Sequence, residues 1–160
     1  MNGKKTLLKL AEKMGSSSVQ EAISLVLSMI QSVEEKSKNK KIYKYELLQY
    51  LYIARNNLNI FIEFNNAQTE IKKLLDDILC LTKENGEIII KNKDYFSLSF
   101  EELKFVMSWA RRISISIKYK EKINGNDNFI KNKRRNSNNY NKSVNDDGID
   151  ERWAVLKKLT

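Results

Sequence analysis

The chain of 160 residues contains no histidine, no proline and a single cysteine, Cys80. Without histidine, neither a Ser-His nor a Cys-His catalytic pair can form, and the common His-based zinc sites are excluded. One cysteine cannot form an internal disulfide or a Cys-x-x-Cys metal site. We therefore expect no catalytic residues, no metal and no cofactor. Cys80 lies among Ile78, Leu79 and Leu81, and we interpret it as a small core residue.

Long apolar runs are also missing. No window reaches the roughly 20 apolar residues that a bilayer-spanning helix needs. The longest candidate, residues 47–64, is interrupted by an arginine and several asparagines, and residues 1–10 lack the apolar run of a secretory signal. The sequence therefore predicts no membrane segment. With its lone cysteine, it favours an intracellular, cytoplasmic location.

The positive charge is concentrated in one part of the chain. Lys and Arg total 29 against 20 Asp and Glu, a formal net charge of +9. Residues 111–142 hold ten basic residues and two acids, an excess of +8 that leaves +1 for the rest of the chain. A local excess of this kind indicates a polyanionic partner, either nucleic acid or an acidic membrane surface. A solubilising basic tail and the composition bias of an AT-rich genome are alternative explanations.

Apolar residues recur at three- and four-residue steps, which predicts a series of amphipathic helices. Gly15 is a suitable residue to end the first helix, and Ser18 with Glu21 predicts a capping box for the second. A glycine between two helices also fits a helix-turn-helix, although Glu21 stands where that motif needs an apolar residue. The predicted helices cover residues 6–14, 19–33, 42–64, 71–81 and 98–122.

Residues 83–97 show no helical period. Asn85-Gly86 is a turn pair and Ile88 to Ile90 is a β-branched run, so a small hairpin is compatible with this segment. No partner strand is evident. We therefore expect an all-α fold, a single bundle of about five to six helices over residues 1–123.

The helix expected over residues 98–122 has the clearest pattern. Ser99 and Glu102 form a capping box, and Leu98 with Leu103 forms the hydrophobic staple that often accompanies it. Its apolar face consists of Leu103, Val106, Met107, Ala110, Ile113 and Ile117. At 100° per residue, four cations line one flank of that face and suit a phosphate backbone. These cations are Lys104, Arg111, Lys118 and Lys122.

Two interpretations stay open for Trp109 and the adjacent Arg111 and Arg112. The arginines can bind a phosphate while Trp109 stacks on a base. Alternatively, Trp109 is buried and the arginines extend from the bundle surface, and we favour packing for Trp109. We also favour core positions over base stacking for a group of tyrosines near the start of the 42–64 helix. These are Tyr43, Tyr45, Tyr50 and Tyr52.

The composition changes after residue 123. Nine asparagines and few apolar residues occupy residues 124–145, so we predict a disordered basic linker over residues 124–148. Its cations would act as a loose electrostatic arm, and they are Lys131, Lys133, Arg134 and Arg135. Residues 149–160 regain helical spacing and predict a short docking helix, which needs a surface to bind. Its apolar residues are Ile149, Trp153, Leu156 and Leu159.

Two segments carry a resemblance to a known family. Residues 43–58 read YKYELLQYLYIARNNL, and residues 98–113 read LSFEELKFVMSWARRI with an aromatic–Ala–Arg-Arg ending. Both are similar to the small, all-helical subunits of CRISPR effector complexes, particularly the RNA-targeting multisubunit type, over residues 19–122. The Asn-rich tail and the Trp153 peptide are not features of that family.

The resemblance implies a structural, non-catalytic subunit of an antiviral defence complex. Copies of it would stack along a ribonucleoprotein filament and contact the guide–target duplex or the displaced strand. By position, the resemblance carries over only to Arg111, Arg112 and Lys118.

Our leading functional hypothesis is sequence-independent binding of a nucleic-acid backbone, RNA or single-stranded DNA, by a subunit of a larger assembly. Five cations would contact phosphates through counterion release, namely Lys104, Arg111, Arg112, Lys118 and Lys122. Its protein partners would be other subunits or copies of itself, with no role for a membrane. The alternatives are a protein–protein adaptor that uses the Trp153 peptide and a small DNA-binding regulator.

Overall fold

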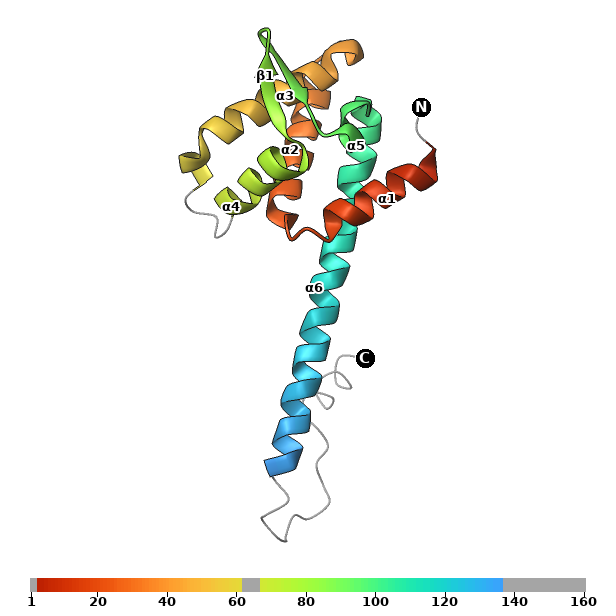
Figure 1. Cartoon of the computed structure of the whole chain (residues 1–160), viewed down its shortest axis with the longest axis vertical. Helices are drawn as coiled ribbons and strands as arrows, with labels where there is room; N and C mark the ends of the chain where they lie inside the picture. The colour runs from red at the N-terminus through yellow and green to blue at the C-terminus, as the bar shows by residue number, and fades with distance from the viewer. Residues whose placement is uncertain (1–2, 62–66, 137–160) are drawn as a thin grey trace, which may run out of the picture. The chain divides into compact units, whose positions relative to one another are not determined.

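The structure is a computed structural model that describes residues 3–61 and 67–136, with side chains as far as Gly125 except that of Phe61. The chain forms two units, Met1–Lys122 and Ile123–Thr160. The described part consists mainly of helices and contains one two-stranded sheet (Figure 1). The prediction of a helical, all-α fold is confirmed in its main feature, and the small sheet is an addition that the prediction did not include.

The helices and strands follow one another in a simple order along the chain. The α-helices are α1 (Lys4–Gly15), α2 (Gln20–Lys36), α3 (Tyr43–Asn56), α4 (Ala67–Lys72), α5 (Lys93–Phe96) and α6 (Phe100–Asn136). The shorter elements are the 3₁₀ helices η1 (Lys40–Ile42) and η2 (Leu58–Phe61), the π-helix η3 (Lys73–Ile78), and strands β1 (Leu81–Glu84) and β2 (Glu87–Ile90). None of the described helices is both long enough and apolar enough to cross a bilayer.

One hydrophobic cluster joins the elements of the first unit. Helix α2 contacts both α3 and α4, and strand β2 contacts α3 and α5. The predicted apolar face of α6 enters this core with Leu103, Val106, Met107 and Ala110, all buried. The same face is only half-buried at Ile113 and Ile117, so the core ends about there along the helix.

The capping box predicted for α6 is confirmed. The Ser99 backbone N–H donates to Glu102 Oε2 at 2.9 Å, and the Glu102 N–H donates to Ser99 Oγ at 3.2 Å. Leu98 and Leu103 of the predicted staple are both buried. Local sequence therefore sets the start of α6.

The capping box predicted for α2 is wrong. Ser18 adopts a positive φ of 58°, and no side chain of this turn caps the helix. Instead, Glu70 of α4 reaches the start of α2, where its Oε2 accepts from the N–H groups of Glu21 at 2.6 Å and Ala22 at 3.2 Å. A carboxylate at a helix N-terminus satisfies free N–H groups and favours the helix dipole. Glu70 thus links α4 to α2.

Gly15 allows the close crossing of α1 and α6. A Cβ at this position would lie 2.7 Å from the Ala110 carbonyl oxygen and 2.9 Å from Ile113 Cβ. Ser114 Oγ, which is buried, donates to the Gly15 carbonyl oxygen at 2.7 Å. The close contact between the two helices explains why a glycine occupies position 15. The helix-turn-helix considered from the sequence is not needed to explain it.

The middle helices differ from their predicted limits. Helix α3 ends at Asn56 rather than at residue 64, because Asn57 leaves helical geometry and its side chain donates to the Ile53 carbonyl at 2.8 Å. The helix predicted over residues 71–81 begins earlier, at Ala67, and widens into a π-helix before residue 78. The bond from the Asn57 side chain to the Ile53 carbonyl competes with the backbone hydrogen bonds of the helix, and the apolar periodicity of the sequence does not reveal it.

The hairpin forms where the sequence showed no partner strand. Strands β1 and β2 pair antiparallel, with Leu81 opposite Ile90. Asn85 and Gly86 take φ values of 50° and 86°, the left-handed geometry of a tight hairpin turn. Cys80, at φ 51°, ends the preceding helix and frees residues 81–84 to pair. Cys80 is only half-buried, so its assignment to the core is wrong.

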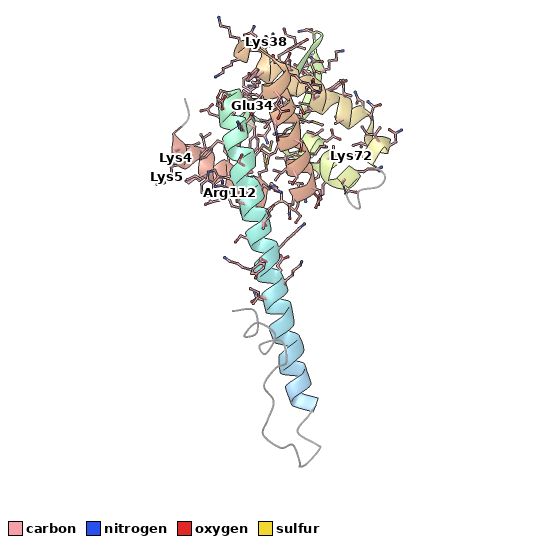
Figure 2. All side chains as sticks on the ribbon, turned by 180° about the vertical axis from the view of Figure 1, so that it is seen from behind. Lys4, Lys5, Glu34, Lys38, Lys72 and Arg112 are labelled. Atoms are coloured by element: carbon pink, nitrogen blue, oxygen red, sulfur yellow. The ribbon has the colours of Figure 1, made fainter. Side chains whose placement is uncertain are left out.

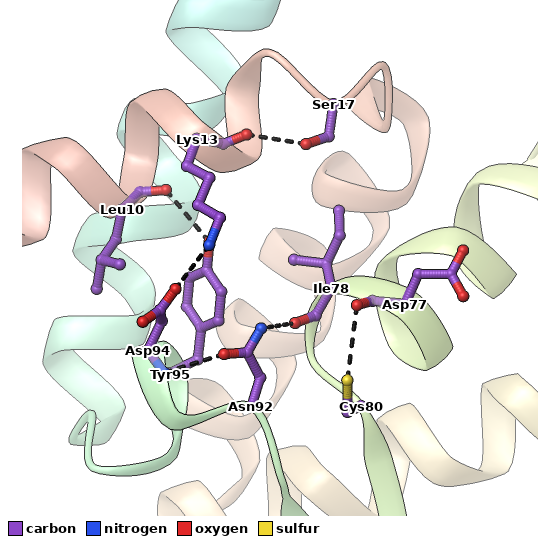
Figure 3. A network of polar contacts seen from close by, with 9 residues as sticks. All are labelled: Leu10, Lys13, Ser17, Asp77, Ile78, Cys80, Asn92, Asp94 and Tyr95. Atoms are coloured by element: carbon purple, nitrogen blue, oxygen red, sulfur yellow. Dashed lines mark hydrogen bonds and ion pairs between the residues drawn. The ribbon is translucent and has the colours of Figure 1, made fainter.

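A small polar network ties helix α5 to α1 and to the π-helix (Figure 3). Buried Tyr95 donates to the Leu10 carbonyl at 3.4 Å, and Lys13 forms an ion pair with Asp94 at 2.7 Å. Burial raises the pKa of Tyr95 to about 12, and the neighbouring Asp94 carboxylate adds to this effect. The hydroxyl therefore keeps its neutral, donating form to a higher pH than an exposed tyrosine does.

The structure describes only part of the predicted C-terminal region. Helix α6 continues through residues 124–136, the first part of the predicted linker. Residues 137–160, which include the predicted docking helix, lie outside the described residues. The proposed limits of linker and docking helix stay predictions.

Candidate nucleic-acid interface

Two cations of the predicted basic stripe are bound within the fold. Lys104 Nζ forms an ion pair with Glu34 Oε1 of α2 at 2.6 Å. Arg111 Nε donates to Ser24 Oγ, also on α2, at 3.1 Å. Both contacts hold α6 against α2. The stripe predicted as one phosphate-binding surface is therefore divided, because its first two members already have protein partners.

Arg112 takes a different position from Arg111. Its guanidinium carbon lies 5.0 Å from the centroid of the Trp109 ring, a cation–π contact. Trp109 is 36% exposed and packs on one side against Phe105, with ring centroids 6.2 Å apart. Packing was the favoured role for Trp109. Its side chain packs against Phe105 but lies at the surface, where its ring also forms the cation–π contact with Arg112. The stacking orients the Arg112 guanidinium on a rigid ring.

Lys118 and Lys122 continue the flank of Lys104 and Arg111 farther along α6. Both are exposed, and neither makes an ion pair or hydrogen bond to the residues that the structure describes. They are four residues apart and so share one side of the helix. Between residues 111 and 125, the sequence has five basic residues against one acid, Glu121. Tyr119, 67% exposed, lies beside them on the helix.

Together these residues form what we call the α6 surface. At 100° per residue Arg112, Tyr119 and Lys122 point away from the buried face, whereas Trp109 and Lys118 lie on its two flanks. The surface combines three cations with two accessible aromatic rings. Its members are Trp109, Arg112, Lys118, Tyr119 and Lys122.

The other predicted site residues lie where the structure gives no side-chain geometry. Four cations fall within the backbone range of α6, but their side chains are outside the described part, namely Lys131, Lys133, Arg134 and Arg135. The four predicted docking residues are outside it entirely, namely Ile149, Trp153, Leu156 and Leu159. Their roles stay predictions.

The tyrosines of α3 divide between core and surface. Tyr43 is buried, with its ring edge-on to Phe100 at a centroid distance of 5.1 Å, and Tyr52 packs against the core. Tyr45 and Tyr50 are 56% and 38% exposed. The core interpretation is therefore right for two of the four and wrong for the other two.

One basic cluster escaped the sequence analysis. Residues 36–44 hold five lysines and no acid. The sum of +1 for the chain outside residues 111–142 conceals this cluster, because acids elsewhere cancel it. A charge count in short windows would have found it.

Metal ligands do not gather in the described residues: no three or more Cys, Asp or Glu side chains come together there. Several carboxylates of the described residues instead form contacts within the fold, as Glu34, Glu70 and Asp94 show.

Comparison of the chain with protein-family models, curated proteins and solved structures finds no match. The resemblance to small CRISPR subunits thus rests on the size of the chain, on its predicted bundle of five or six helices, and on residues 43–58 and 98–113. In the structure these segments contribute α3 and the first half of α6, and they meet at the Tyr43–Phe100 contact.

Proposed function

We propose that this protein is a non-catalytic, cytoplasmic subunit of a ribonucleoprotein assembly that binds nucleic-acid backbone without sequence preference. The observation that carries the proposal is the α6 surface, where Arg112 is oriented on Trp109 and where Lys118 and Lys122 have no partner among the described residues. Cations without a partner in the fold can contact phosphates without giving up another interaction. By contrast, Lys104 and Arg111 would have to give up contacts with α2.

The accessible rings favour a single strand as ligand. Aromatic side chains among cations stack on unpaired bases of any sequence, while the cations follow the phosphates. Trp109 and Tyr119 are the two such rings on the α6 surface. RNA or single-stranded DNA is therefore the proposed partner. The CRISPR-like resemblance supports an assembly in which several copies line one strand.

The two alternatives have weaker support. The adaptor hypothesis depends on the Trp153 peptide, which lies outside the described residues. The regulator hypothesis requires a dimer and a sequence preference, and the α1–α6 crossing gives a packing role to Gly15, the residue that also fitted the joint of a helix-turn-helix.

The direct test is fluorescence anisotropy of labelled single- and double-stranded RNA and DNA, titrated with the full chain. The variant Lys118→Ala/Lys122→Ala should bind single strands more weakly and reduce the slope of log K against log salt by about two. The matched control is Lys72→Ala/Lys73→Ala, which removes the same charge from exposed positions on α4 and the π-helix (Lys72 is labelled in Figure 2). Equal binding by both variants would refute the proposed site.

A further inference from the structure

The connection between α2 and α3 is the second strongly basic surface of the first unit. We call residues 36–44 the lysine turn, since they hold five lysines and no acid. Lys38, Lys40 and Lys41 are exposed, and their side chains make no ion pair within the described part of the chain. This separates them from Lys13, Lys91 and Lys104, each of which is paired with a carboxylate.

The lysine turn has a defined shape. Asn39 Oδ1 accepts from the Lys41 N–H at 3.1 Å and so caps η1. The Tyr43 hydroxyl donates to the Ser37 carbonyl at 3.2 Å, and its ring packs on Phe100. The cations therefore project from an ordered backbone. Ordering before binding reduces the conformational entropy lost when a ligand is bound.

A hollow of about 380 Å³ adjoins the turn at the start of α6. Lys40, Lys41 and Lys44 line it, together with Ser99 and one acid, Glu101. Three cations face a single carboxylate, so the hollow favours an anion. Its size exceeds that of one phosphate group and leaves room for part of a nucleotide.

Lys44, one of the residues that line this hollow, is fixed in place by backbone carbonyl groups. Its Nζ donates to the Phe96 carbonyl at 3.1 Å and to the Leu98 carbonyl at 2.6 Å. Burial lowers the pKa of Lys44, and the Glu102 carboxylate partly opposes that shift. Lys44 is thus fixed by the backbone before α6, while Lys40 and Lys41 remain free to contact a ligand.

Exposed aromatic rings accompany these cations. Phe96 is 57% exposed and belongs to the segment whose carbonyls hold Lys44. Tyr45, the residue after Lys44, is 56% exposed. Rings beside cations form the kind of platform on which unpaired bases stack. The α6 surface shows the same combination, which makes a common ligand the simplest explanation.

We infer that the lysine turn and its hollow form a second phosphate-binding site, so that one nucleic-acid strand contacts this protein at two places along α6. The inference rests on the proposed function and adds to it the path of the strand. In Figure 2, Lys38 lies toward the start of α6 and Arg112 lies farther along that helix. Phe100 and Arg112 are twelve residues apart, or roughly 18 Å at 1.5 Å per residue.

This spacing predicts a minimum strand length. For a stacked strand that keeps the rise of about 3.4 Å per nucleotide found in a duplex, roughly five nucleotides separate Phe100 from Arg112 and roughly eight separate Phe100 from Lys118. A strand of twenty nucleotides can occupy both sites at once, and the second contact then benefits from a high effective concentration. A strand of three nucleotides can occupy only one site.

The experiment measures anisotropy of fluorescein-labelled oligouridylates of three and twenty nucleotides with the full chain. The variants are Lys40→Ala/Lys41→Ala, Lys118→Ala/Lys122→Ala and the control Lys72→Ala/Lys73→Ala. We expect each of the first two to weaken binding of the long strand by about tenfold or more, because the linked contact is lost. Either variant should weaken binding of the short strand by no more than about twofold, because the other site remains. Thermal melts should show unchanged folding, since all six lysines are exposed.

The outcomes separate the two claims. If Lys40→Ala/Lys41→Ala binds the long strand like the control while Lys118→Ala/Lys122→Ala binds weakly, the second site is refuted and the proposed function stands. If only Lys40→Ala/Lys41→Ala binds weakly, the lysine turn is the site and the α6 surface is refuted. If both variants lose as much affinity for the short strand as for the long strand, the inference that one strand contacts both sites is wrong.

Discussion

The two halves of the described part of α6 continue the same helix but lie in different environments. From Phe100 to Ala110 the apolar face is buried, and Lys104 is paired with Glu34. From Arg112 to Lys122 the cations make no ion pair or hydrogen bond with the described residues, and Tyr119 is exposed. Basic residues on one flank of a helical wheel can therefore have two different roles. In the first half it stabilises the fold, and in the second it is available to a ligand.

The comparison shows that the neighbouring residues decide whether a cation is available to bind a ligand. Lys104 and Lys118 stand on the same flank of the helix. Lys104 meets an acid on α2, whereas Lys118 lies beyond Ala110, the last fully buried residue of the apolar face. The following predictions probe this difference, beginning with the largest expected effect.

Truncating a side chain of the first half should affect stability far more than truncating one of the second. Met107→Ala removes a side chain that is 1% exposed and leaves a cavity, so the free energy of unfolding should fall by about 2–5 kcal/mol. Ile115→Ala, at a position 43% exposed, should change it by less than about 1 kcal/mol. Urea denaturation measures both. Equal losses would show that the second half also packs against the protein.

Gly15→Ala should destabilise the point where the two halves meet. The new Cβ would lie 2.7 Å from the Ala110 carbonyl oxygen, and overpacking of this kind costs about 1–3 kcal/mol. The control is Gly125→Ala, whose Cβ would have no atom within 4 Å and which should stabilise α6 by up to about 1 kcal/mol. Thermal unfolding of the two variants should therefore shift in opposite directions.

Buried Tyr95 should produce a loss of stability at alkaline pH. Its folded pKa of about 12 lies above the ordinary value of 10.0, so its neutral form is favoured by folding. That contribution is complete below pH 10 and disappears as the pH rises toward 12. Tyr95→Phe should remove this part of the pH dependence and cost about 1 kcal/mol at neutral pH, because the hydrogen bond to Leu10 is lost. Tyr119→Phe, at an exposed position, should retain the alkaline loss.

The smallest stability effect is expected at the paired cation. Lys104→Ala should lower the free energy of unfolding by about 0.2–1 kcal/mol, the usual range for a partly exposed ion pair. Lys118→Ala should leave it unchanged, since no pair is broken. A double-mutant cycle of Lys104 with Glu34 measures the interaction itself. A coupling of zero would mean that Lys104 is as available as Lys118.

The parts of the fold that sequence predicted are those with local causes. The apolar period of α6 and its Ser99–Glu102 capping box both arise within a few residues and were confirmed. The hairpin also had a local signal in Asn85-Gly86. Residues 81–84, however, follow a helical pattern directly, and the sequence does not show that the helix ends before Cys80. Local patterns report a turn more readily than the strand that pairs across it.

The missed features depend on residues far apart in the chain. Glu70 caps α2 across 49 positions of sequence, and Glu34 binds Lys104 across 70. Ser24 accepts from Arg111 across 87 positions. No periodicity or spacing contains these pairings, because the packing of α2 on α4 and α6 creates them. They are also what divided the predicted basic stripe, so the candidate site could be predicted only in its second half.

The salt dependence of RNA binding by Lys104→Ala and Lys118→Ala tests the central claim most directly. Both variants remove one charge from the same flank of the same helix. The account predicts that Lys118→Ala lowers the slope of log K against log salt by about one, whereas Lys104→Ala leaves the slope at the wild-type value. Equal reductions in both variants would contradict the account, because the whole stripe would then contact phosphates despite the Glu34 ion pair.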